Sequence, residues 1–250
     1  MRLQLATWPE VEDYLKTSTG IIVPIGSTEQ HGPTGLIGTD ALTAEAIGTR
    51  LGEATGAYVA PTIAVGMAQH HLGFTGSMTL RPTTLIAVVK DMVESLMVHG
   101  FERFFFVNGH GGNIATVTAA FSEIYAVSSM AGATNRASVK CTLHNWWKMP
   151  GVTELAAELY GDAEGSHATA SEVAVTYALF PEDAARIRNA PMEPGLAPDG
   201  DIYDAADYRR NFPDGRIGSD PRLSEAEHGE RFMAIATAEL AELYKEFTAS

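Results

Sequence analysis

The stretch that decides the fold is FERFFFVNGHGGN, at residues 101–113. Three phenylalanines and a valine form the most apolar short run of the chain, which predicts a buried strand at 104–108. The run ends in a glycine-rich turn that carries His110, and a helix is predicted from Ile114 to about Ser129. A buried strand followed by a tight turn and a helix is typical of α/β proteins with a parallel sheet.

The same alternation extends in both directions along the chain. It predicts strands at 20–26, 58–63 and 139–144, and helices at 40–51, 84–99, 168–179 and 224–247, the last with a capping box that begins at Ser224. This order predicts a single α/β domain over residues 1–250, with a mostly parallel central sheet and helices on both faces. The proline-rich region at about 189–221 is expected to be a long irregular excursion that caps a site, forms a subunit contact or stays mobile.

Composition excludes several classes of protein. The formal net charge of −14 opposes binding to nucleic acid or to an anionic membrane surface, so we expect neither partner. A hydrophobic content of 45% with 19% charged residues argues against disorder. Cys141 is the single cysteine, which excludes an internal disulfide and a thiolate zinc site. The N-terminal residues lack the apolar core of a signal peptide, and a cytoplasmic location is expected.

Polar residues that suit metal binding follow the first and third predicted strands. Glu29, His31 and Asp40 lie just after the strand at 20–26, and His110 lies directly after the strand at 104–108. Carboxylates and imidazoles are the ligands that zinc and manganese prefer, and the carboxyl ends of parallel strands are where ligands gather. The alternatives are a satisfied polar loop around Glu29 and a glycine-rich phosphate loop around His110, although the latter lacks the lysine and spacing of a P-loop.

A third group consists of His167 and Glu172, which lie just before and about one turn into the helix predicted at 168–179. Both side chains could face the same cleft. The alternative for Glu172 is a solvated helix carboxylate.

These motifs, in this order, resemble the creatininase (creatinine amidohydrolase) family. The resemblance rests on EQHGP at 29–33, Asp40, NGHGGN at 108–113, HLGFTGS at 71–77, the segment from His167 to Glu172, and GSDP at 218–221. It implies an α/β hydrolase that holds two divalent metal ions and cleaves C–N amide bonds through a metal-bridged hydroxide. Zinc is the first expectation, with Mn²⁺ or Fe²⁺ as alternatives. It also implies a homo-oligomer, usually a hexamer, and a small-molecule amide substrate.

The resemblance also assigns roles to individual residues. Asp40 matches the carboxylate that bridges the two metals, Glu29 and His110 complete one metal site, and His31 belongs to the other. His167 matches a histidine that moves a proton to the leaving nitrogen. The creatinine-hydrolysing members carry a glutamate ligand where this chain has Gly112, and Glu172 is expected to fill that place. Glu172 is also the weaker alternative to His167 as the proton donor.

The substrate contacts are expected from His71, Gly111, Gly112, Trp146 and Trp147. The creatinine enzyme carries a tyrosine where this chain has Gly111, and a GHGGN loop is typical of deformylase- and peptidase-type relatives, so creatinine is one candidate among several amides. Two other functions stay open: a dinuclear-metal phosphoesterase, which has little cationic support near the motifs, and a creatininase-fold binding or assembly protein without catalysis.

Overall fold

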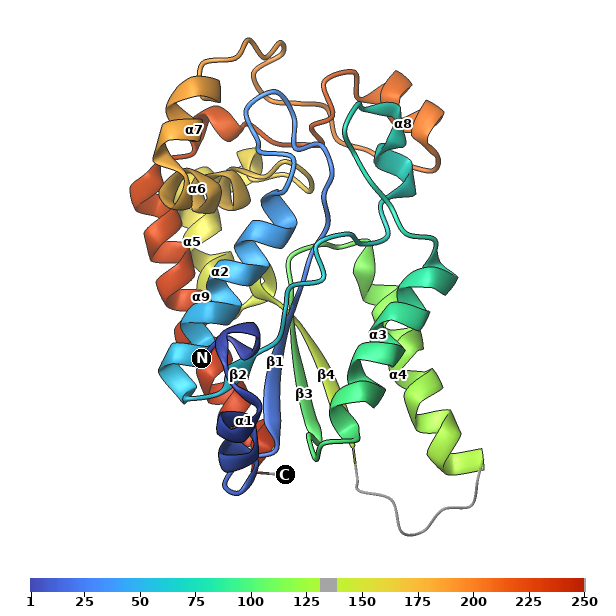
Figure 1. The fold of residues 1–250 in the computed structure, drawn as a ribbon. Coiled ribbons are helices and arrows are strands. Elements are labelled where there is room, and N and C mark those ends of the chain that lie inside the picture. The colour runs from blue at the N-terminus through green and yellow to red at the C-terminus, as the bar shows by residue number, and fades with distance from the viewer. Residues whose placement is uncertain (131–138, 250) are drawn as a thin grey trace.

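The computed structural model describes residues 1–130 and 139–249 of the chain. Its centre is a parallel four-stranded sheet with the order β2-β1-β3-β4 (Figure 1). The strands are β1 (Gly20–Ile25), β2 (Tyr58–Val59), β3 (Arg103–Asn108) and β4 (Lys140–Asn145). All three strand pairings are parallel, which confirms the predicted sheet.

Helices cover both faces of the sheet, as predicted (Figure 1). One face carries α2 (Thr39–Thr55), α5 (Pro150–Tyr160), α6 (Ala170–Leu179) and α9 (Ala226–Thr248), and the other carries α3 (Pro82–Met97) and α4 (Asn113–Met130). The remaining α-helices are α1 (Trp8–Leu15), α7 (Pro181–Ile187) and α8 (Ala205–Asn211). In the part of the chain that the structure describes, no helix combines the length and apolarity needed to cross a membrane.

Strand β3 forms the centre of both core layers because its side chains alternate between the two faces. Phe105 packs in the cluster with α2 and α9, whereas Phe104 and Phe106 pack in the cluster with α3 and α4. All three rings are fully buried. Each buried ring of this kind contributes about 1.5–3 kcal/mol of hydrophobic free energy, which explains why a strand buried on both faces carries a continuous apolar run.

The carboxyl ends of β1, β3 and β4 lie at one level. Ile25 pairs with Asn108, and Asn108 pairs with Asn145. The loops that follow these strands therefore leave the sheet together, at the edge where the sequence predicts the chemistry.

Several elements differ from the predictions. Strand β2 has two residues instead of six, although Ile63 still forms an isolated bridge to Ile25. Helices α1, α5 and α7 were not predicted, and α8 lies inside the region predicted to be irregular. The capping box at Ser224 was wrong: α9 begins at Ala226, and the buried Ser224 hydroxyl donates to the carbonyl of Ala170 at 2.8 Å. This hydrogen bond links the segment before α9 to α6, so the Ser224 hydroxyl does not cap α9.

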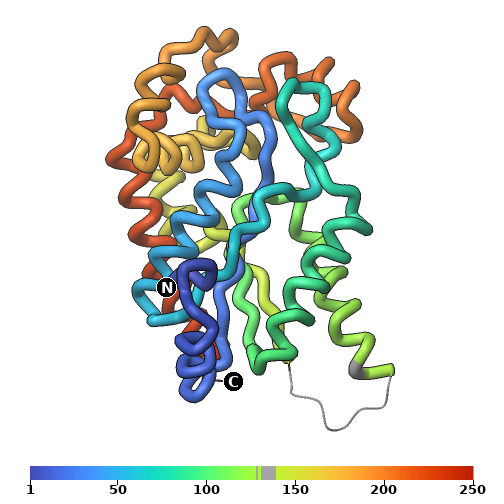
Figure 2. The backbone as a smooth tube through the Cα atoms, in the orientation of Figure 1, coloured from blue at the N-terminus to red at the C-terminus, as the bar shows by residue number. Residues whose placement is uncertain are grey.

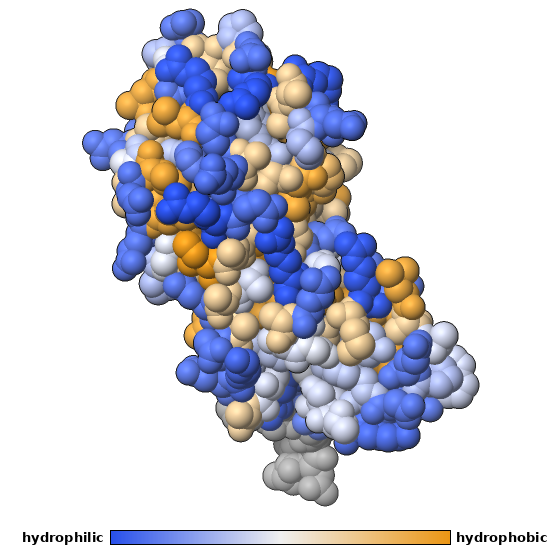
Figure 3. Space-filling model, turned by 90° about the vertical axis from the view of Figure 1, so that its left-hand side faces the viewer, coloured by the Kyte–Doolittle hydropathy of each residue, from blue (hydrophilic) through white to orange (hydrophobic). Residues whose placement is uncertain are grey.

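The excursion at 189–221 returns across the end of the molecule that holds the loop after β1 (Figure 2). An antiparallel bridge joins Ile217 to His167, and α8 packs on a 3₁₀-helix, η2 (Gln69–Gly73). Seen from the side of α7 and α9, hydrophilic residues cover much of the surface, with smaller apolar areas between them (Figure 3).

Candidate metal centre

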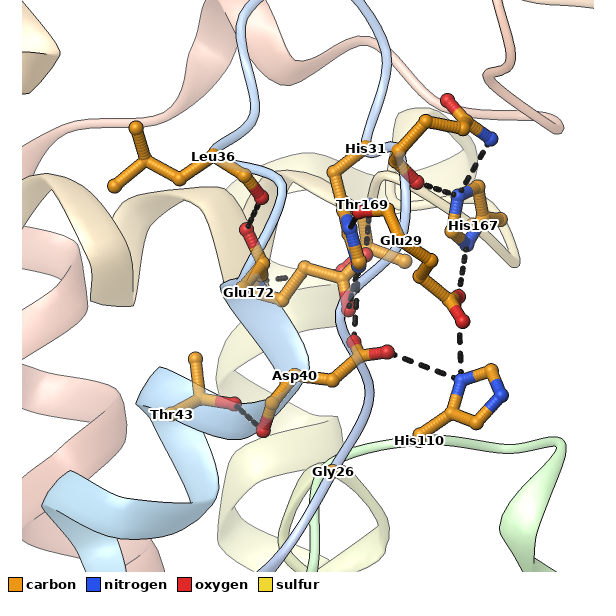
Figure 4. Close-up of polar contacts among 12 residues, drawn as sticks. Gly26, Glu29, His31, Leu36, Asp40, Thr43, His110, His167, Thr169 and Glu172 are labelled. Carbon is orange, nitrogen blue, oxygen red and sulfur yellow. Dashed lines mark hydrogen bonds and ion pairs between the residues drawn. The ribbon is translucent and has the colours of Figure 1, made fainter. Parts of the chain in front are cut away.

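Six predicted site residues meet at the carboxyl edge of the sheet (Figure 4). Glu29 and His31 lie in the loop after β1, Asp40 in the first turn of α2, and His110 in the loop after β3. His167 lies in the segment just before α6, and Glu172 lies in the first turn of that helix. Two strands, β1 and β3, and two helices, α2 and α6, thus support one cluster of side chains.

Asp40 lies at the centre of this cluster. Its Oδ1 atom is 2.9 Å from Nε2 of His31, and its Oδ2 atom is 3.0 Å from Nδ1 of His110. Two groups of ligand atoms result, each with all its atoms within 4.8 Å of one another: Glu29, Asp40 and His110, and His31, Asp40 and Glu172. Asp40 is common to both groups and offers a different oxygen to the histidine of each. A third group of this kind joins Glu29, His31 and His167.

Backbone carbonyls fix the ring protons of both histidines. Nδ1 of His31 lies 3.0 Å from the carbonyl oxygen of Glu29, and Nε2 of His110 lies 2.9 Å from that of Met67. A carbonyl only accepts hydrogen bonds, so these nitrogens donate. The opposite nitrogens, which face Asp40, then carry lone pairs in the neutral rings. This is how metal-ligating histidines are held in proteins.

The buried charges also fit cations. Neither carboxylate oxygen of Glu29 has a hydrogen-bond partner in the described structure, nor does Oδ2 of Asp40, although all three are buried. Burial opposes the charged form of Glu29, but His110 and His71 outweigh it and lower the pKa of that carboxyl well below its usual range. Burial likewise opposes protonation of His31, but Asp40 and Glu172 raise its pKa to about 10. The cluster therefore requires positive charge between its carboxylates and imidazoles, as protons or as metal ions.

Glu172 has one oxygen for its helix and one for the cluster. Oε1 accepts a hydrogen bond from the backbone N–H of Thr169 at 2.6 Å, as part of a capping box. Oε2 lies 3.8 Å from Nε2 of His31. Burial is the main cause that raises the pKa of Glu172, to about 7. Glu172 thus lies beside His31, and its role as a replacement for the ligand expected at Gly112 stays a prediction.

Gly112 also has a local reason to be glycine. A β-carbon at this position would collide with the His110 ring and the Met67 carbonyl, the two groups that form the hydrogen bond described above. At Gly109 a β-carbon would collide with the backbone of Asp40. The loop after β3 thus packs closely on both metal-ligand candidates because it carries glycine at these two positions.

Two buried asparagines hold the same loop. The Asn108 side chain donates to the carbonyl of His110 at 2.7 Å and accepts from its backbone N–H at 3.1 Å. Asn113 donates to the carbonyl of Gly26 at 2.9 Å and accepts from the N–H of Met67 at 3.0 Å. These bonds fix the loop after β3 against β1 and against the Met67 carbonyl that orients His110.

His71 and His167 contact the cluster in different ways. His71 is buried, with Nε2 3.0 Å from Oε1 of Glu29. His167 directs Nε2 to the backbone carbonyl of Gln30 at 2.8 Å, and its Nδ1 lies 4.0 Å from Oε1 of Glu29. Burial, with the neighbouring His71 and His31, lowers the pKa of His167 well below its usual range. Its ring is therefore neutral near pH 7, with a lone pair on Nδ1.

A cavity of about 610 Å³ opens beside the cluster. Asp40, His110, His167 and Glu172 line it, together with Gly111, Trp147, Lys148, Glu164 and, from α5, Thr153 and Ala157. Trp146 is buried in the core, and neither it nor His71 nor Gly112 is among the described residues that line the cavity. Their positions do not support the substrate contacts predicted for them. Trp146 and Trp147 separate because they are consecutive in a tight 3₁₀ turn, which sends one ring inward.

Sequence reasoning missed Gln30 and Tyr208. The Nε2 atom of Gln30 lies 3.0 Å from the hydroxyl of Tyr208, and both residues are buried. Gln30 belongs to the EQHGP motif at 29–33, so the sequence could have indicated a role for it. No sequence pattern connects it to Tyr208.

The chain is similar to known proteins over most of its length. The family model Creatininase, described as creatinine amidohydrolase, matches residues 4–244. Creatinine amidohydrolase of Pseudomonas putida is 26% identical over 249 residues, which cover 96% of this chain and 94% of that protein. The 3-dehydro-scyllo-inosose hydrolase of Thermotoga maritima is 27% identical over 97% of this chain and 77% of its own length. The mycofactocin precursor peptide peptidase of Mycobacterium ulcerans is 34% identical over 51% of this chain and 50% of its own.

Solved structures share the fold. A structure described as creatininase Mn has a TM-score of 0.84 at 24% identity, covering 100% of this chain and 99% of that chain. A creatininase mutant described as the Zn-Zn type has a TM-score of 0.83 at 24% identity, covering 100% and 98%.

Proposed function

The chain belongs to the creatininase family of hydrolases, and on this premise we propose that it hydrolyses a C–N amide bond of a small molecule with two bound divalent metal ions. The observation that carries the proposal is the position of Asp40, whose two carboxylate oxygens face two different histidines at 2.9 and 3.0 Å. A carboxylate placed in this way suits a pair of cations better than a single one.

The residues present fit such a pair. Glu29, Asp40 and His110 would hold one ion, and His31, Asp40 and Glu172 the other. Nitrogen and oxygen donors of this kind favour zinc, and Mn²⁺ and Fe²⁺ bind the same set. When bound, such ions act as Lewis acids and lower the pKa of bound water toward about 7.

His167 is our candidate for the proton transfer. His167 lines the cavity, its Nδ1 lies on the side of Glu29, and its Nε2–H donates to the Gln30 carbonyl. In amide hydrolysis a water oxygen bonds to the carbonyl carbon, the C–N bond breaks, and one water proton moves to the departing nitrogen. His167 would accept that proton at Nδ1 and then donate it from the same atom, a role worth roughly 10²–10⁴ in rate.

The cavity supports a compact substrate. Trp147, Ala157 and Ile114 give it apolar surface, and the exposed Gly111 leaves room beside His110. A cyclic amide or a formamide matches these dimensions. Similarity to a peptidase keeps a short peptide among the candidates.

A phosphoesterase is the second candidate, because Lys148 lies on the cavity wall. It is the single lysine or arginine among the described residues that line the cavity. One cation is weak support for a phosphate, whose charge such enzymes usually neutralise with metals and several cationic groups.

Metal analysis combined with a substrate panel tests the proposal. The purified protein should hold close to two divalent ions per chain and turn over creatinine, an N-formyl amine, another cyclic amide or a short peptide. Turnover of p-nitrophenyl phosphate alone would favour the phosphoesterase, and two ions without turnover would favour a binding protein. His167→Ala should keep both ions and lose at least about 10²-fold in kcat. The hexamer and the cytoplasmic location stay predictions, the first to be checked by light scattering.

A further inference from the structure

The side-chain amide of Gln30 lies at the junction of four polar groups behind the metal-centre residues. Its Nε2 atom is 3.1 Å from Nδ1 of His71, 3.0 Å from Nε2 of His167, 3.0 Å from the Tyr208 hydroxyl and 2.9 Å from the Gly215 carbonyl. Two of these partners come from the excursion at 189–221, more than 170 positions away in sequence. Gln30 itself is buried.

The orientation of this amide is determined by its neighbours. The backbone N–H of Gly32 can only donate, and it lies 2.8 Å from the other amide atom, which must therefore be the oxygen. The NH₂ group consequently faces the four groups named above. Its two hydrogens are all that it can offer to them.

His167 cannot receive either hydrogen. Its Nε2 atom lies 2.8 Å from the backbone carbonyl of Gln30, an acceptor, and so carries the ring proton. The Gly215 carbonyl and the Tyr208 oxygen lie side by side, since the Tyr208 hydroxyl donates to Gly215 at 2.7 Å, and a single amide hydrogen directed between them can serve both. The other hydrogen is left for Nδ1 of His71.

His71 is therefore held as a donor to the metal centre. When Nδ1 accepts from Gln30, the ring proton lies on Nε2, which is 3.0 Å from Oε1 of Glu29. This close contact places the ring N–H against Oε1 of Glu29 and leaves Oε2 facing the rest of the cluster. The opposite tautomer would direct a nitrogen lone pair at a carboxylate oxygen and a proton at an N–H group.

We propose that Gln30 is a positioning residue that fixes the ring protons of His71 and, through its backbone carbonyl, of His167, and that Tyr208 and Gly215 of the excursion hold Gln30 in place. The excursion is thereby part of the site without touching the substrate. The assignment of the two tautomers follows from the hydrogen-bond geometry alone, whereas the predicted effect on turnover rests on the proposed function.

The test reads the ring protons directly. Long-range ¹H–¹⁵N spectra of the zinc-loaded protein with ¹⁵N-labelled histidine distinguish the two tautomers, and His71→Gln and His167→Ala assign the signals. We expect Nε2–H on both His71 and His167. Nδ1–H on His71 in the unsubstituted protein would overturn the proposal without any variant.

Gln30→Glu is the sharpest variant, because it keeps the shape of the side chain and replaces the NH₂ group by an acceptor. His71 should then gain a proton on Nδ1, and kcat should fall roughly 10- to 100-fold, the range seen when groups behind metal ligands are changed. Metal content should stay near two ions. If Gln30→Glu does not fold, Gln30→Ala should still give a mixture of His71 tautomers. An unchanged His71 spectrum in either variant refutes the positioning role.

Ser77→Ala is the matched control. The Ser77 hydroxyl accepts the backbone N–H of Gln30 at 3.1 Å and does not contact its amide group. Spectrum and kcat should stay as in the parent protein. The tautomer result does not depend on turnover: the expected spectra with no amide hydrolysis would refute the proposed function and leave the positioning role standing.

Discussion

Glu172 reaches His31 with the carboxylate oxygen that its own helix does not use, with Oε2 at 3.8 Å from Nε2. The other oxygen accepts from Thr169 and begins α6. Helix start and candidate ligand are thus the same residue, and the two roles can be separated by experiment.

Glu172→Ala should reduce the metal content to about one ion per chain, because the His31 group loses its third donor. Activity should fall with it. Thr169→Ala removes the hydroxyl that caps the same turn, at a cost of about 1 kcal/mol in unfolding free energy, and should keep both ions. Mass-spectrometric metal analysis after dialysis measures the difference. If Glu172→Ala retains two ions at normal affinity, Glu172 is no ligand.

Asp40→Asn should lose both ions together, because each carboxylate oxygen faces a different histidine and the amide cannot serve two cations. Glu164→Gln is a suitable control: Glu164 lines the same cavity but belongs to none of the three ligand groups. We expect the control to hold close to two ions by the same analysis. One ion bound to Asp40→Asn with unchanged affinity would show that Asp40 does not bridge.

Gly112→Ala should disrupt the metal site of His110, because the new methyl group would occupy the space of the bond between His110 and Met67. We expect a 10- to 100-fold loss of metal affinity, of the order found when a hydrogen bond behind a ligand is lost. Gly111→Ala is the matched control, since a β-carbon there has no neighbour within 4 Å. Equal affinities for the two variants, by competition with a chelator, would contradict the packing argument.

Metal binding should release protons. In the metal-free chain burial lowers the pKa of His31, but Asp40 and Glu172 outweigh it and raise the pKa to about 10. His31 is therefore protonated at pH 7.5 and must lose its proton to bind a metal. Calorimetry in two buffers of different ionisation enthalpy should give at least about one proton released per chain, with affinity that rises with pH. No release would show that His31 is already neutral.

The stability of the metal-free protein should follow the same shift. Because the folded-state pKa of His31 lies above its unfolded value, the stabilisation from its charged form is complete below about pH 6.5 and is lost as the pH rises through about 10. The Tm of the chelated protein is expected to fall across that window. In His31→Gln the Tm should depend less on pH over the same range; an equal dependence would assign the effect to other groups.

The central strands could be predicted because a strand that is buried on both faces has a continuous run of apolar residues. Phe104, Phe105 and Phe106 pack in the two core layers, and the polar residues after them mark the end of the strand. Glu29, His31 and His110 could be predicted for the same reason, since they lie in the loops that follow β1 and β3, whereas Asp40 lies farther along the chain, in the first turn of α2.

The remaining features depend on tertiary contacts that no local pattern records. Helix α5 was missed because a short amphipathic segment after Pro150 is ambiguous before its packing partner α9 is known. Trp146 and Trp147 are adjacent and identical, yet one fills the core and the other lines the cavity. The contact between Gln30 and Tyr208 spans 178 positions and depends on how the excursion folds back.

The close packing of Gly109 on Asp40 limits where substitutions can be made to change the substrate specificity of the enzyme. The candidate metal-ligand side of the cavity has no room for added atoms at Gly109, so substitutions are better made at exposed cavity positions, such as Thr153 and Ala157, one turn apart on α5. Libraries restricted to those two sites would vary what is recognised while the reaction centre is inherited unchanged.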